Sequence, residues 1–351
     1  MKILPNNSSL IYSGRIDLSD PFAIVWTYPG TFVRIKFKGT QLSIHVRNKH
    51  NYWNNYLGVV EGDAQTKLLL PKEGEATIEI PLQTTQDNIH EVTIFKRQDA
   101  CHELTILDFE INCNTDDECE LLEASPLPPR RIEVYGDSVS AGEVSEAVDY
   151  VAKSDPEHNG EYSNSWYSYA WITARKLDAQ LHDIAQGGIA LLDNTGWYHE
   201  PDYIGMEHVW NKMRYDSSYG QVTEWDFSKY TPDIVIVAIG QNDSHPDDYM
   251  KTDYECEKAK NWRTHYRQFL AKLRETYPDA WIICCTTLLQ HDISWDMSIS
   301  QAVLDIADKK ISHCVFQRNG KATPGHLRIP EAEEMAEELC HYIHSLNIEG
   351  Y

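Results

Sequence analysis

The sequence has no apolar run that approaches the roughly 18 residues needed to cross a membrane. Residues 1–7 also lack the apolar core and small-residue cleavage site of a secretory signal peptide. No internal repeat or low-complexity tract is evident. We therefore expect no membrane partner and a cytoplasmic location.

Basic residues are scarce beside acidic ones. Lys and Arg number 31 and Asp and Glu number 54, so the formal net charge is −23. A field of this sign repels nucleic acid and anionic membranes and favours solubility. Neutral ligands such as sugars are not penalised by it, and nucleic acid is not expected as a partner.

The eight cysteines are scattered without metal-ligand spacing, so they indicate no metal site. Cys284 and Cys285 lie inside an apolar strand pattern. Cys113 and Cys119 flank an acidic loop and could pair in an oxidising setting. In the cytosol, however, free thiols are the default.

The apolar fraction of 42%, with 10 Trp and 20 Tyr, is typical of a folded globular protein. A chain of 351 residues is long for one hydrophobic core and indicates two domains. The many aromatic residues are also compatible with a homo-oligomer.

Residues 1–120 contain short segments of period two with turn residues between them, such as residues 32–37, 42–46, 76–80 and 91–95. This spacing predicts an antiparallel β-sandwich, for which a jelly roll is the favoured topology. Residues 121–130 are rich in proline, which predicts a stiff linker. A second domain then covers residues 131–351.

Strand and helix patterns alternate in this second domain. Apolar strands at residues 131–136, 181–185, 234–239 and 281–288 are separated by helical patterns such as residues 261–276 and 330–346. Such alternation predicts an α/β domain with a parallel sheet covered on both faces. Functional groups are then expected at the carboxyl ends of the strands.

One such strand ends in the sequence Gly136-Asp137-Ser138. A serine at a sharp turn from strand to helix is held rigidly and lies beside unpaired N–H groups, so it could be a nucleophile. Taken alone, the tripeptide could equally be a polar turn.

Three further blocks follow in order: Gly188 after a short strand, Asn242 after residues 234–239, and His326 before the last helix. This order resembles that of the SGNH (GDSL) hydrolases. The resemblance implies a flavodoxin-like catalytic domain in which Ser138 is the nucleophile and His326 is its base. The implied oxyanion donors are the backbone N–H groups of Ser138 and Gly188 and the side-chain amide of Asn242. Gly187 is a less favoured choice for the glycine.

In most members of this superfamily an aspartate three residues before the histidine orients the base, and here that position is Thr323. Either a backbone carbonyl or water holds His326, or an aspartate from elsewhere, such as Asp292 or Asp296, takes that place. Asp137 and Asp243 are expected to order their own turns.

A sandwich of about 120 residues before such a domain, with Gly14-Arg15 near its start and Lys96-Arg97 in a late strand, resembles carbohydrate esterase family 2. The resemblance covers nearly the whole chain. It implies a Ser-His acetyl esterase that acts on xylan-derived or related plant oligosaccharides without a cofactor. It also marks Trp295, in an apparent loop before the histidine block, as a candidate sugar contact. The alternatives are a short-chain lipid esterase or thioesterase, and a carbohydrate-binding protein that has lost catalysis.

Overall fold

The computed structural model describes residues 1–85, 87–113 and 119–351. The chain divides into two compact units. The first contains Met1–Leu127, Asn159–Glu161 and Met213–Thr223, and the second contains the remaining residues from Pro128 onward. The main division, between Leu127 and Pro128, falls inside the stretch predicted as the linker, 121–130. The start of that stretch differs from the prediction, because Glu120–Leu122 forms strand β12 of the first unit.

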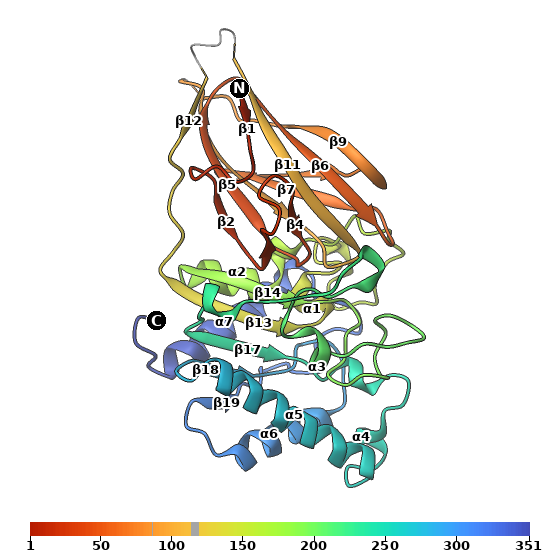
Figure 1. The fold of residues 1–351 in the computed structure, drawn as a ribbon. Helices are drawn as coiled ribbons and strands as arrows, with labels where there is room; N and C mark the ends of the chain where they lie inside the picture. Colours follow the sequence, from red (N-terminus) through yellow and green to blue (C-terminus); the bar gives the residue numbers. More distant parts are fainter. Residues whose placement is uncertain (86, 114–118) are drawn as a thin grey trace. The chain divides into compact units, whose positions relative to one another are not determined.

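Within the described residues, the first unit contains two six-stranded antiparallel sheets (Figure 1). The first sheet has the order β3 (Ile16–Asp17), β4 (Ile24–Trp26), β11 (His102–Asn112), β6 (Gln41–His50) and β9 (Glu73–Ile80), and β1 (Lys2–Ile3) pairs with β11. The second has the order β12 (Glu120–Leu122), β5 (Phe32–Lys38), β10 (Ile89–Lys96), β7 (Tyr56–Glu61) and β8 (Ala64–Leu69), and β2 (Ile11–Ser13) pairs with β5.

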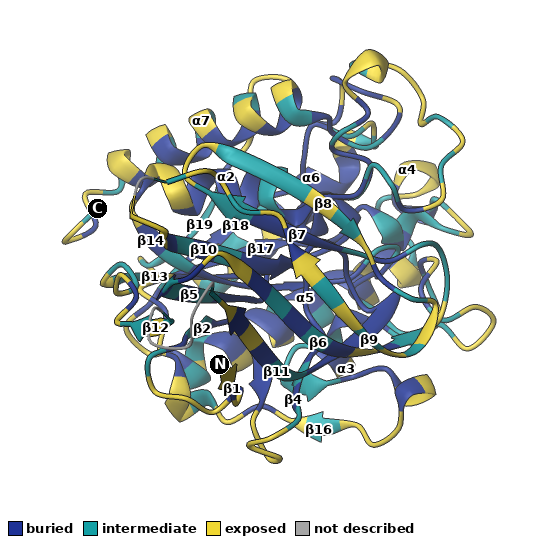
Figure 2. Cartoon of the chain, turned by 90° about the horizontal axis from the view of Figure 1, so that it is seen from above, coloured by how far each residue is buried: buried dark blue, intermediate teal, exposed yellow. Residues whose placement is uncertain are grey.

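The alternation in the sequence explains this sandwich. In β5, Val33, Ile35 and Phe37 are fully buried, while Arg34 and Lys36 between them are partly exposed. Inward-facing apolar side chains from both sheets form one core, and Figure 2 shows both buried and exposed residues in these sheets. The predicted antiparallel N-terminal domain is confirmed.

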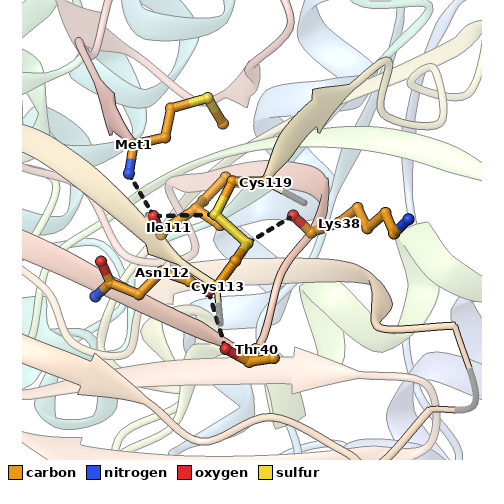
Figure 3. The surroundings of a disulfide bond; sticks show 7 residues. All are labelled: Met1, Lys38, Thr40, Ile111, Asn112, Cys113 and Cys119. Atoms are coloured by element: carbon orange, nitrogen blue, oxygen red, sulfur yellow. Dashed lines mark hydrogen bonds between the residues drawn. A yellow bond between two sulfur atoms is a disulfide. The ribbon is translucent and has the colours of Figure 1, made fainter. Parts of the chain in front are cut away.

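Cys113 and Cys119 are joined by a disulfide whose Cα atoms are 5.7 Å apart (Figure 3). It links the end of β11 to the start of β12, and the Cys119 sulfur lies 3.7 Å from the carbonyl oxygen of Ile111. The sequence favoured free thiols here, and the structure instead shows the alternative pairing. The other six cysteines all lie in the described part of the chain, and none of them forms a disulfide.

The second unit is built on a five-stranded parallel sheet (Figure 1), whose order among the described residues is β14 (Ala179–Ala185), β13 (Arg130–Gly136), β17 (Ile234–Ala238), β18 (Trp281–Cys284) and β19 (Ile311–His313). Helix α2 packs against α7, and α5 packs against α6. The helices are α1 (Ser138–Ala141), α2 (Tyr169–Lys176), α3 (Met206–Val209), α4 (Tyr249–Thr252), α5 (Glu257–Thr276), α6 (Ile293–Ile306) and α7 (Ile329–Ser345). Shorter elements of this unit are single turns of 3-10 helix at Val148–Tyr150, Ser165–Tyr167, Phe227–Lys229 and Asn242–Ser244. The segment Met213–Thr223 of the first unit contains a further such turn at Ser217–Tyr219, and β15 (Lys212–Arg214) and β16 (Thr223–Glu224) lie at its two ends.

Burial explains why this part of the chain folds as a covered parallel sheet. All five residues of β17 are buried, as expected for a strand with helices on both sides. Helix α5 turns one apolar face inward, including Trp262, Tyr266 and Phe269. The predicted helix-flanked parallel sheet is confirmed. In the described part of the chain, we find no helix that combines the length and the apolar character of a membrane span.

Candidate active site

Ser138 is the first residue of α1, directly after the buried strand β13. The carboxylate of Asp137 accepts the backbone N–H of Val139 at 3.0 Å and so caps the helix. Gly136 allows α1 to lie close to the strand, because a Cβ at this position would lie 2.0 Å from the hydroxyl oxygen of Ser140. The turn therefore holds Ser138 rigidly at the carboxyl end of the sheet, where only 5% of its surface is exposed.

His326 lies just before α7 and is held by Asp155. Its ring Nδ1 is 2.6 Å from Oδ2 of Asp155, and its backbone N–H donates to Oδ1 at 2.9 Å. These two contacts fix the ring and leave Nε2 as the nitrogen that can take a proton from a nucleophile. His326 was predicted as the base, whereas Asp155 was not predicted to be its partner.

Two charged residues at the start of α7 fix the segment that carries Asp155. The buried guanidinium of Arg328 lies 2.9 Å from Oδ1 of Asp155 and also donates to the carbonyl oxygen of His326. Glu331 accepts the backbone N–H of Ala152 at 2.8 Å. Partial burial acts to raise the pKa of Asp155, but His326 and Arg328 outweigh it and hold that pKa at about 2. Asp155 is therefore ionised at neutral pH.

Gly188 and Asn242 lie in the turns after β14 and β17, the two strands beside β13. Gly188 has a φ of +74°, and a Cβ there would lie 2.8 Å from Cβ of Trp197. The amide Nδ2 of Asn242 donates to the carbonyl oxygen of Ile189 at 3.0 Å and lies 3.4 Å from Oδ2 of Asp137. It therefore links the turns that follow three neighbouring strands. The role of Gly188 and Asn242 as oxyanion donors stays a prediction.

A network of buried polar groups supports these turns. Gln241 donates to Oδ2 of Asp137 at 2.8 Å and accepts the hydroxyl proton of Thr287. Asp243 accepts the backbone N–H of Leu191 at 2.8 Å and so connects the turn after β17 to the turn after β14. Burial raises the pKa of Asp137, and it raises the pKa of Asp243 to about 7. Asp137 orders its own turn, as the sequence suggested, whereas Asp243 binds the backbone of the neighbouring turn after β14.

Trp197 is an exposed aromatic residue directly beside the glycine block. Its backbone N–H donates to the carbonyl oxygen of Gly188 at 2.8 Å, and 56% of its surface is exposed. Its ring stacks on His245, with ring centroids 3.3 Å apart and planes inclined by 20°. His245 follows Asn242 by three residues. The stacked rings of Trp197 and His245 therefore form a flat surface beside the turns that carry Gly188 and Asn242.

The structure corrects the interpretation of Trp295. This residue lies in the first turn of α6 rather than in a loop, and none of its surface is exposed. Its indole N–H donates to Asp248 at 3.0 Å, and its ring packs edge-on against Trp262 and Tyr249. A side chain with no exposed face cannot stack on a sugar, so Trp295 is a core residue.

The aspartates suggested as partners of His326 have other roles. Asp292 caps α6 by accepting the backbone N–H of Ser294, and Asp296 lies 2.9 Å from Nε2 of His291. Thr323, the position at which the resemblance to the SGNH hydrolases would place the aspartate, is fully buried. The general suggestion of an aspartate from elsewhere holds, but the residue is Asp155.

Two pockets lie near these elements. One of about 560 Å³ runs along α6, and its lining residues include Met297 and Val315 but neither Ser138 nor His326. A smaller one of about 260 Å³ is lined by Asp243 and His245 among others, next to the Asn242 turn. Among the residues that the structure describes, no group of three or more His, Cys, Asp or Glu side chains could hold a metal ion.

Comparisons with known proteins indicate similarity to carbohydrate esterases. A family model described as the N-terminal part of carbohydrate esterase 2 matches residues 12–117. The chain resembles the family 2 carbohydrate esterases. This resemblance, inferred above from the order of the blocks and the sandwich before them, is confirmed.

The similarity to these proteins extends over both units. The chain is 28% identical over 345 residues to cellulase/esterase CelE of Acetivibrio thermocellus, covering 95% of this chain and 39% of that protein. It is 28% identical over 281 residues to an acetylxylan esterase/glucomannan deacetylase of Cellvibrio japonicus, covering 77% of this chain and 69% of that one. A family two carbohydrate esterase from Clostridium thermocellum, solved with cellohexaose, superimposes with a TM-score of 0.79 at 25% identity, covering 96% and 98% of the two chains.

Proposed function

We propose that this protein is a carbohydrate O-acetyl esterase that works through Ser138 and His326. The observation that carries the proposal is the contact between Asp155 and Nδ1 of His326, which leaves Nε2 as the nitrogen able to act as a base. The resemblance to the family 2 carbohydrate esterases supports the substrate class, an ester of a sugar hydroxyl. No metal or organic cofactor takes part in the proposed reaction.

In the first step the hydroxyl oxygen of Ser138 attacks the acetyl carbonyl carbon while its proton passes to Nε2 of His326. The tetrahedral intermediate then collapses, and the imidazolium returns that proton to the departing sugar hydroxyl. A water molecule, deprotonated by the same nitrogen, attacks the acetyl-serine in the second step. Acetate leaves, and Ser138 regains its proton.

The oxyanion of each intermediate is stabilised by the backbone N–H groups of Ser138 and Gly188 and by the amide of Asn242. The 3.4 Å contact from Asn242 to Asp137 is the weaker of the two that this amide makes. It is the contact that the oxyanion would replace. Losing one such donor generally costs about 3 kcal/mol of transition-state stabilisation.

The proposed substrate is an acetylated xylo-oligosaccharide or a related plant oligosaccharide. The exposed ring of Trp197, stacked on His245, offers a flat apolar face for a sugar ring next to Gly188. The net charge of −23 does not oppose a neutral sugar.

The test is acetate release from acetylated xylo-oligosaccharides by the wild type and by Ser138→Ala, with propionyl and butyryl esters as comparison substrates. We expect activity confined to acetyl groups and lost in the variant. Ser345→Ala, which removes an exposed hydroxyl in the last turn of α7, is the matched control and should retain full activity. A preference for butyryl esters would instead indicate a short-chain lipid esterase or thioesterase. Glycan binding without turnover would indicate a binding protein.

The cytoplasm is our proposed location on the sequence alone, and short imported oligosaccharides would then be the natural substrates. Efficient release of acetate from insoluble acetylxylan, with no activity on oligomers, would contradict this part of the proposal. The disulfide between Cys113 and Cys119 favours an oxidising compartment instead.

A further inference from the structure

The two ring nitrogens of His326 face two different carboxylates. Nδ1 contacts Asp155, whereas Nε2 lies 3.9 Å from Oε2 of Glu143. Glu143 follows the glycine that ends α1, and its backbone N–H donates to the carbonyl oxygen of Ser138 at 2.9 Å. Its side chain is largely buried, with 14% of the surface exposed. Glu143 is thus fixed on the same turn as the proposed nucleophile and faces the nitrogen that must accept the serine proton.

We propose that Glu143 is a positioning residue that sets the pH at which His326 becomes able to act as a base. The proposal rests on the function proposed above. A carboxylate beside Nε2 stabilises the positively charged ring, in which that nitrogen carries a proton, much more than it stabilises the neutral ring. The protonated ring is then held by carboxylates at both nitrogens and cannot accept the proton of Ser138.

Four charged groups face His326 from the elements around it. Three of them are carboxylates that favour the protonated ring: Asp137 before α1, Glu143 on the turn after α1, and Asp155 on the segment that follows. The only cation of this set, Arg328, lies 2.9 Å from Asp155, so much of its effect on the ring is offset by that carboxylate. Burial acts to lower the pKa of His326, but the carboxylates of Glu143, Asp155 and Asp137 together outweigh it and raise that pKa to about 9.

The direction of the pH dependence follows from the raised pKa of His326. His326 is protonated below its pKa and is then inactive as a base, so kcat/KM should rise with pH and level off above about pH 9. Replacing Glu143 by an uncharged residue of the same shape removes one of the groups that retain the proton. The rise in activity should then begin at lower pH.

The experiment is the pH profile of kcat/KM on a soluble acetyl ester for the wild type and Glu143→Gln. We expect the midpoint of the acidic limb to fall by about one to two pH units, since an opposite charge at this distance typically shifts a pKa by that much. At pH values well below both midpoints, a shift of one unit makes the variant about tenfold more active than the wild type. The high-pH plateau should change little.

Glu157→Gln is the matched control, because it removes the same charge from an exposed position two residues after Asp155. Its midpoint should stay within a few tenths of a unit of the wild type. The titration of the His326 Cε1–H resonance, assigned as the signal missing from His326→Gln, reports the same pKa without turnover. An unchanged midpoint in Glu143→Gln, or an equal shift in Glu157→Gln, would overturn the proposal. A wild type with no esterase activity would refute the proposed function, while the titration would still test the effect of Glu143 on His326.

Discussion

Asp155 reaches His326 from 171 residues earlier in the chain and binds it at two points, the ring Nδ1 and the backbone N–H. An amide in place of the carboxylate would no longer stabilise the imidazolium, and it could present its N–H to Nδ1 and so favour the wrong tautomer. We predict that Asp155→Asn lowers kcat roughly 10²- to 10⁴-fold with little change in KM. Steady-state kinetics on an acetylated oligosaccharide, with circular dichroism to confirm folding, measure the effect. A loss of less than threefold would mean that Asp155 does not serve the base.

The residues of the site differ in how far the sequence could predict them. Ser138, Gly188 and Asn242 each follow an apolar strand, so the periodicity that predicts the strand also indicates the turn. Asp155 and Glu143 follow no such pattern. Asp155 lies in the polar insertion 144–167, and its contact with His326 depends on how that segment and the start of α7 fold together. No local signal in one sequence reports a contact of this kind.

At the scale of elements, α6 explains why Trp295 was misinterpreted. Residues 292–296 were interpreted as a loop because of the resemblance, but Asp292 is the N-cap and the helix begins at Ile293. Trp295 then faces the core, while Ile293 and Met297 are exposed. The helices α5 and α7 were predicted closely because each carries a long apolar face, whereas the start of α6 was recognisable only from its cap.

This placement of Trp295 gives a prediction that separates stability from binding. Trp295→Ala should lower the free energy of unfolding by about 3–5 kcal/mol, because it empties a fully buried site, and should leave KM unchanged. Trp197→Ala should instead raise KM about tenfold, which corresponds to a loss of about 1.4 kcal/mol of binding free energy, and should leave the free energy of unfolding unchanged. Denaturant unfolding and kinetics on both variants measure the two effects. A raised KM in a stable Trp295→Ala protein would restore the sugar-contact interpretation.

At the scale of the whole molecule, the sequence and the structure favour different cellular compartments. The sequence predicts a cytoplasmic location and free thiols, but the structure joins Cys113 to Cys119 and leaves the other six cysteines outside any disulfide, five of them buried. If the disulfide forms in the native host, protein that is lysed and unfolded there in the presence of an alkylating reagent should carry six labels, and later reduction should release two further thiols. Closing so short a loop is worth about 2 kcal/mol, so Cys113→Ser/Cys119→Ser should unfold at correspondingly lower denaturant concentration. Eight reactive thiols at lysis would instead place the enzyme in a reducing compartment, where imported oligosaccharides are its natural substrates.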